Sequence, residues 1–114
     1  MNKNIKKTIL IDLDGVLNEY SGKYEKDFIP KPATGVQVFL EKLSQTYNIT
    51  IFTTRNTKLT KNWLKQNSLD IYITDVTNIK KPCYLYIDDR AICHNGDFDS
   101  TIHQVEKFRV HWNK

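Results

Sequence analysis

Cysteine is scarce in this chain, which has only Cys83 and Cys93. They follow neither a C-x-x-C pattern nor a zinc-ligand spacing, and two cysteines make a poor disulfide framework. We therefore interpret both as reduced thiols of a cytoplasmic protein. Long apolar stretches are also missing, whereas a membrane-spanning helix needs about 20 consecutive apolar residues. No membrane is expected as a partner, and the lysine-containing N-terminus does not continue into a secretory apolar segment.

The histidines and basic residues do not indicate a metal site or a nucleic-acid-binding surface. His94, His103 and His111 show no metal-ligand spacing, so we interpret them as surface or packing residues. The net charge of +4 is modest, and it fits an anionic substrate, which a basic surface attracts over long range. No aromatic platform is interleaved with basic residues, so nucleic acid is a possible partner that the sequence does not favour.

The remaining composition is that of an ordinary globular protein. With 114 residues, of which 39% are hydrophobic and 26% charged, the chain predicts one domain over residues 1–114 with a single core. Short apolar runs alternate with segments of helical periodicity, which is typical of a parallel sheet covered by helices. We expect an α/β, doubly wound (Rossmann-like) domain with a mainly parallel sheet of about four to five strands. The expected strands are 8–13, 49–53, 70–74 and 84–88, and the expected helices are 34–46, 57–67 and 100–108.

Two of these helices have recognisable starts. Thr34 is the candidate cap of the first, and the segment 97–100 carries capping residues before the last. The last helix has apolar side chains at Ile102, Val105 and Phe108, and we expect Trp112 to pack the C-terminus down.

The most informative segment is the apolar run 9–17, which carries Asp12 and Asp14 into a turn at Gly15. Such runs are typical of buried parallel strands, and ligands of parallel sheets gather at the carboxyl ends of the strands. Two carboxylates this close can share one hard cation, and Mg²⁺ prefers oxygen ligands. Asp12 can then attack phosphorus as a nucleophile, while Asp14 moves the proton of the leaving or attacking oxygen.

A second run, 48–55, ends in Thr53, Thr54 and Arg55. At the end of a strand a hydroxyl can donate to a phosphoryl oxygen, and an arginine can offer a planar fork to a phosphate. Threonine also simply favours strands. That preference does not explain two hydroxyls and an arginine together, so we predict that Thr54 and Arg55 help to bind the substrate.

The third region places lysines before a further strand and an acidic pair after it. Lys80 and Lys81 precede the run that ends at Asp88 and Asp89. A lysine in a loop is usually just solvated. Adjacent aspartates are harder to dismiss, because they repel each other unless a cation or hydrogen bonds stabilise them. The pair therefore indicates a second part of a metal site.

Taken in order, these segments resemble the four motifs of the haloacid dehalogenase-like (HAD) superfamily of phosphatases, over about Thr8 to Ile92. The first motif of that superfamily matches the Asp12 segment, and its second, a threonine or serine closing the second strand, matches Thr53. Thr54 is the alternative, one register step away. The third motif is a lysine that holds the nucleophile and the phosphoryl group. Lys81, beside a proline, is the match, but the segment up to the acidic pair is about one residue short, so Lys80 stays open.

The resemblance implies a Mg²⁺-dependent phosphohydrolase that forms an aspartyl-phosphate on Asp12. The ion would be held by Asp12, the backbone carbonyl of Asp14 and Asp88, with Asp89 in support. Thr53 and the lysine would stabilise the phosphoryl oxygens. A non-catalytic phosphate-binding or regulatory module on the same fold is the alternative, since a fold does not guarantee activity.

Residues 18–33 are too few for a folded cap domain and long enough for a hairpin flap. The resemblance therefore implies a small capless member, with a site that the flap or a second subunit must cover. An open site suits a bulky phosphomonoester such as a sugar phosphate or nucleotide, a nucleic-acid end or a phosphoprotein. The sequence does not choose among these substrates.

Overall fold

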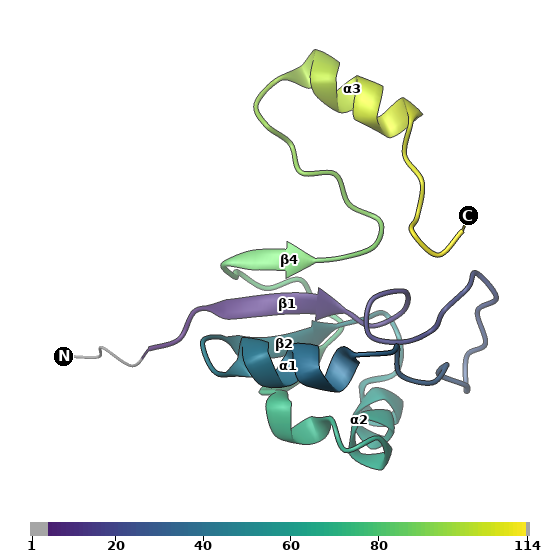
Figure 1. The fold of residues 1–114 in the computed structure, drawn as a ribbon, viewed down its shortest axis with the longest axis vertical. Helices are drawn as coiled ribbons and strands as arrows, with labels where there is room; N and C mark the ends of the chain where they lie inside the picture. The colour runs from purple at the N-terminus through teal and green to yellow at the C-terminus, as the bar shows by residue number, and fades with distance from the viewer. Residues whose placement is uncertain (1–4, 114) are drawn as a thin grey trace.

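The structure, a computed structural model, describes residues 5–113 and has one parallel sheet at its centre. The strand order is β3-β2-β1-β4, and every pairing is parallel (Figure 1). This arrangement confirms the expected Rossmann-like α/β fold, and it is compatible with a HAD-like one. The strands are β1 (Thr8–Asp12), β2 (Asn48–Phe52), β3 (Asp75–Thr77) and β4 (Leu85–Ile87), and the helices are α1 (Val36–Ser44), α2 (Thr57–Gln66), the short 3₁₀ helix η1 (Asp70–Tyr72) and α3 (Phe98–Glu106).

The core is built on the two central strands. β1 pairs with β2 in the register Ile9 to Ile49 and Ile11 to Ile51, and all four isoleucines are buried. Alternate residues of a strand face the same side, so these side chains form one apolar face. Helical residues, among them Leu40 of α1, join the same core cluster. Burying each such side chain stabilises the fold by roughly 1.5–3 kcal/mol.

The predicted strand at 70–74 was wrong. Asp70–Tyr72 form the 3₁₀ helix η1, and the strand comes later, at Asp75–Thr77. Its position is set by pairing with the carboxyl half of β2, where Thr50 lies opposite Asp75. Alternating Ile and Tyr residues imitate a strand pattern, but the chain first has to turn from α2 to the sheet edge, and Ser68 turns it with φ 57°.

Of the two predicted helix starts, the one at 97–100 was confirmed, and Asn56 is a cap that was not predicted. The side chain of Asn56 caps α2 by accepting from the backbone N–H of Leu59, and Asp97 caps α3 by accepting from Asp99. The expected cap Thr34 was wrong. The residue before α1 is Gly35, which has φ 86° and provides no side-chain hydrogen bond. A left-handed turn at this point needs glycine more than it needs a capping hydroxyl.

Two segments extend from the sheet. Residues 18–33 form the predicted flap, closed by antiparallel bridges between Asn18 and Pro32 and between Glu25 and Phe28. α3 stands apart from the sheet, beyond β4 (Figure 1). Among the described residues, no helix is both long and apolar enough to cross a membrane.

Candidate active site

Carboxylates from two neighbouring strands meet at the carboxyl edge of the sheet. Asp12 is the last residue of β1, and Asp88 and Asp89 directly follow β4. Because β1 and β4 are parallel, with Ile11 opposite Ile87, both strands deliver their acids to the same place. A carboxylate oxygen from each aspartate lies within 4.8 Å of one from each of the others. We call these three residues the acidic cluster.

The close approach of the three carboxylates shifts the pKa values of two of them. Burial, a hydrogen bond with Asp89 and repulsion from Asp88 and Asp89 raise the pKa of Asp12 from 3.8 to about 8. The pKa of Asp89 is instead lowered. Burial opposes its ionisation, but hydrogen bonds, of which the one from Trp112 has the largest effect, keep the pKa below the ordinary value. Without a cation, these shifts favour a proton on Asp12 and a charge on Asp89 near neutral pH. Three oxygen donors this close fit a hard divalent cation such as Mg²⁺.

The C-terminal segment completes one side of the cluster. The indole N–H of Trp112 donates to Oδ2 of Asp89 at 2.6 Å, and His111 Nε2 hydrogen-bonds the carbonyl of Gly15. Gly15 has φ 84°, and a side chain there would collide with Asp89 and Trp112. Trp112 packs the C-terminus down as expected, but its hydrogen bond to Asp89 and the role of His111 carried no sequence signal.

Asp14 lies outside the acidic cluster and is held by a buried arginine. Nε of Arg55 donates to Asp14 Oδ2 at 2.8 Å, and the side-chain amide of Asn18 donates to Oδ1 at 3.0 Å. Arg55 Nη1 donates to the carbonyl of Glu25 in the flap, and the guanidinium lies over the ring of Tyr24. Asp14 is therefore fixed in orientation by a network that also ties down the flap.

Arg55 has different surroundings from those that its predicted role as a phosphate fork requires. Its side chain is fully buried, and Nη2 has no hydrogen-bond partner among the described residues. Arg55 does not line the hollow beside the acidic cluster. Its role as a substrate ligand stays a prediction, whereas its contact with Asp14 is direct. The sequence pattern of two threonines followed by an arginine does not indicate which carboxylate the arginine contacts.

The hollow beside the cluster has a volume of about 350 Å³. Both threonines border it: Thr53 is buried, and Thr54 is exposed. The Thr53 hydroxyl accepts a hydrogen bond from the backbone N–H of Arg55. The choice between the two threonines therefore stays open. The hollow is lined by Asp12, Asp14, Tyr20, Tyr24, Phe52, Thr53, Thr54, Asp88, Asp89 and Arg90.

Neither candidate lysine borders this hollow. The ammonium of Lys81 lies 3.5 Å from Asp75, at the amino end of β3 and away from the acidic cluster. Lys80 lies over the ring of Tyr86 and lines a neighbouring hollow that reaches Asp88. Lys80 therefore lines a hollow that includes Asp88, whereas Lys81, the better match to the third motif, pairs with Asp75.

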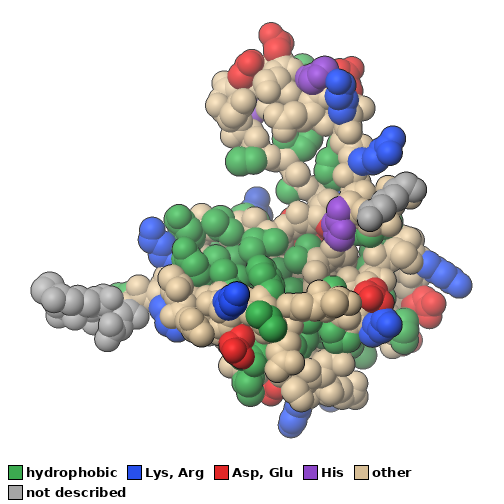
Figure 2. Space-filling model, viewed as in Figure 1, with side chains coloured by type: hydrophobic (Ala, Val, Ile, Leu, Met, Phe, Trp, Pro, Cys, Tyr) green, Lys and Arg blue, Asp and Glu red, His purple; other side chains and the backbone are tan. Residues whose placement is uncertain are grey.

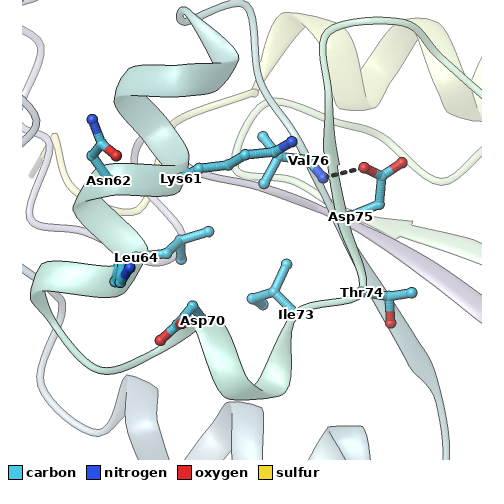
Figure 3. A pocket seen from close by; sticks show the side chains of 9 residues that line it. Lys61, Asn62, Leu64, Asp70, Ile73, Thr74, Asp75 and Val76 are labelled. Carbon is cyan, nitrogen blue, oxygen red and sulfur yellow. Dashed lines mark hydrogen bonds between the residues drawn. The ribbon is translucent and has the colours of Figure 1, made fainter.

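A further hollow of about 300 Å³ lies between α2 and β3 (Figure 3). Lys61 and Leu64 border it from the helix, and Thr74 and Asp75 from the start of the strand. The Asp75 carboxylate accepts from the backbone N–H of Val76, as the dashed line shows (Figure 3). This hollow opens at the amino ends of the strands, where ligands of parallel sheets are not expected.

Comparison with known proteins informs the fold alone. No protein-family model matches the chain, and no curated protein matches it. Among solved structures, the chain is similar to a conserved protein from Bacteroides thetaiotaomicron, with a TM-score of 0.59 and 17% sequence identity. The alignment covers 90% of this chain and 92% of that one. At this identity the likeness supports the α/β architecture and transfers no activity.

Proposed function

We propose that this chain is a Mg²⁺-dependent phosphohydrolase of the HAD type that acts on a phosphomonoester through an aspartyl-phosphate. One observation carries the proposal: Asp12, Asp88 and Asp89 converge at adjacent parallel strand ends, while a fourth carboxylate, Asp14, is held separately nearby. A metal site alone needs only the first three. The separate and oriented fourth acid is what proton transfer during phosphoryl transfer requires.

The acidic cluster would hold the metal ion. Its donors are all oxygens, and burial together with the neighbouring aspartates raises the pKa of Asp12, an effect that a bound cation would oppose. The backbone carbonyl of Asp14 is a further expected ligand. A bound Mg²⁺ supplies the charge that lets all three carboxylates ionise and that offsets the charge of a phosphate.

In the first half-reaction a carboxylate oxygen of Asp12 attacks phosphorus, and the bond between phosphorus and the leaving oxygen breaks. Asp14 gives its proton to that leaving oxygen. Arg55 and Asn18 hold the Asp14 carboxyl in one orientation, so it need not be ordered during the reaction. The Thr53 and Thr54 hydroxyls border the same hollow and can donate to phosphoryl oxygens.

In the second half-reaction water attacks the phosphorus of the aspartyl-phosphate. Asp14, now ionised, takes a proton from that water, and the bond from phosphorus to Asp12 breaks. Inorganic phosphate leaves, Asp12 regains its carboxylate and Asp14 regains its proton. A non-catalytic phosphate-binding module would need neither a nucleophile nor this separate acid.

The surroundings of the hollow bear on the substrate. Tyr20 and Tyr24 of the flap border it, and no cap domain is present among residues 5–113. A short flap leaves room for a leaving group larger than the hollow itself. We expect the substrate to be a bulky phosphomonoester, such as a sugar phosphate or nucleotide, a nucleic-acid end or a phosphoprotein.

The decisive test of this function compares leaving groups. With Mg²⁺, the wild type should hydrolyse an aryl phosphate. Asp14→Asn should slow alkyl phosphates at least about a hundredfold and aryl phosphates far less, since a good leaving group needs no protonation. Asp97→Asn, at an exposed helix cap far from Asp14 in the chain, is the control. Equal losses on both substrates would remove Asp14 from the role of acid. Phosphate binding without turnover would favour the non-catalytic module, and a panel of nucleotides, sugar phosphates and oligonucleotide ends would identify the substrate.

The two lysines make a matched pair for a second test. We expect Lys80→Ala to lower kcat about tenfold or more, because Lys80 lines a hollow that also reaches Asp88. Lys81→Ala should leave kcat within about twofold, because its exposed pair with Asp75 contributes little. Steady-state kinetics at saturating Mg²⁺ measure both. The reverse order would restore Lys81 to the role that the resemblance gave it.

A further inference from the structure

β4 carries an apolar surface that the other residues within 5–113 leave uncovered. β4 is an edge strand, and Leu85 and Tyr86 on it are both exposed. A hollow of about 730 Å³ runs along it, which is larger than the one at the acidic cluster. We call this surface the β4 flank; its lining residues are Phe52, Lys80, Leu85, Tyr86, Ile87, Asp88, Ala91, Ile92 and Cys93.

α3 presents a second uncovered apolar surface. Phe98, Ile102 and Val105 recur at helical spacing on one side, and Phe108 follows the helix end. Phe98 is 76% exposed, and no residue of the described helix is buried, in contrast to α1 and α2. Together these four side chains expose on the order of 400 Å² of apolar surface. An amphipathic helix normally turns such a face toward a core.

In the part of the chain that the structure describes, these two surfaces do not pack against each other. Figure 2 shows hydrophobic side chains over the sheet at β1 and β4, and others on the side of α3 that looks toward them, with space between. The segment that follows α3 is held beside the acidic cluster. Val110 is buried, and the indole N–H of Trp112 donates a hydrogen bond to Asp89. With this segment held there, α3 lies apart from the sheet of its own chain (Figure 1).

Charge complements this pattern. α3 and its two caps carry three acidic residues, Asp97, Asp99 and Glu106, and one basic residue, Lys107. The β4 flank contains Lys80, which lies over the ring of Tyr86, and one aspartate, Asp88, while Lys7 lies over Tyr84 just before the strand. The acidic amino end of α3 therefore suits the part of the flank around Lys80.

We propose that two copies of this chain exchange α3, so that the helix of each packs against the β4 flank of the other. The chain itself provides both halves of the contact, and a two-fold axis repeats it. If each flank matches the helix in area, two contacts bury about 1,600 Å² in total, which is the size of a standard stable interface. Asp88 borders both the flank and the hollow at the acidic cluster, so the partner helix packs next to that site.

The first test is the oligomeric state of the full chain. Light scattering after size exclusion should give a dimer that dissociates on dilution. Ile102→Glu on α3 and Leu85→Glu on the flank should each weaken the dimer at least about tenfold, because each buries a carboxylate in an apolar contact. His103→Glu is the matched control, since it places the same group on the opposite side of α3. Circular dichroism checks that each variant is folded. A wild type that stays monomeric at every concentration overturns the proposal.

Cross-linking separates exchange from closure of α3 onto its own sheet. Cys83 and Cys93 are replaced by serine, and one chain receives Ile102→Cys while another receives Leu85→Cys. Under exchange, oxidation of the mixture gives a covalent heterodimer. Under exchange, oxidation of a single chain type that carries both substitutions also gives a covalent dimer. A covalent monomer from that double variant shows that α3 folds back on its own chain, and refutes the exchange.

Discussion

Asp12→Asn is expected to abolish turnover, with a loss in kcat of at least about 10³, or ~4 kcal/mol. The amide preserves the shape at the end of β1 but lacks the anionic oxygen that attacks phosphorus. The same substitution should raise the thermal stability of the metal-free protein at pH 8, because a neutral group replaces a half-buried carboxylate whose pKa is about 8. Loss of activity together with a gain in stability distinguishes a lost nucleophile from a damaged fold.

Asp70→Asn is a suitable control for that experiment. Asp70 is exposed in η1, away from the acidic cluster, so both activity and stability should stay near those of the wild type. Kinetics with an aryl phosphate and thermal melts without Mg²⁺ supply the two readings. An Asp12→Asn variant that keeps a tenth or more of the wild-type rate, within ~1.4 kcal/mol, would end the covalent mechanism.

Removal of divalent metal should eliminate activity, and its return should stabilise the protein. Because Mg²⁺ binds the folded acidic cluster, the melting temperature should rise with its concentration by mass action. The gain should be larger at pH 8 than at pH 6, since a proton on Asp12 competes with the ion at the lower pH. Asp88→Ala should reduce the stabilisation and raise the Mg²⁺ concentration that activity requires. Full activity in excess chelator would return these aspartates to a structural role.

The sign of the pH dependence follows from the two shifted groups. The pKa of Asp12 is about 8 in the folded protein and near 3.8 when unfolded, so its ionisation opposes folding. The metal-free protein should therefore lose stability as the pH rises from about 4 to 8. Asp89, with its lowered pKa, contributes in the opposite direction, and its contribution is lost only when the pH falls below the ordinary range of a carboxyl group.

The sheet and the acids at its edge were predictable because both depend on local pattern. The runs that end at Asp12 and Asp88 are apolar and short, and parallel pairing brings their ends together whatever the intervening loops do. The strand at 75–77 was missed because it is only three residues long and has a single apolar side chain, Val76. Its strand character comes from the partner β2 and not from its own composition.

Contacts between distant loops could not be predicted. Arg55 contacts the flap carbonyl of Glu25 and the Asp14 carboxylate, and neither contact follows from its place at the end of β2. Lys81 matches the third motif by its neighbour proline, yet its ammonium lies beside Asp75. Both sets of contacts depend on the conformations of the loops next to the sheet, and motif spacing in the sequence does not determine those conformations. The exposed position of α3 was equally invisible, because its apolar spacing is that of an ordinary packed helix.

The attachment of the C-terminal segment to the turn at Gly15 has a consequence for how the molecule forms. The hydrogen bond from His111 joins groups 96 residues apart in the chain, and Trp112 meets Asp89 in the same place. Pairing of β1 with β2 and β4 already joins distant parts of the chain, and it leaves Trp112 only 23 residues from Asp89. We expect the indole donor to reach the acidic cluster after the strands have paired, because that pairing shortens the loop that still has to be closed.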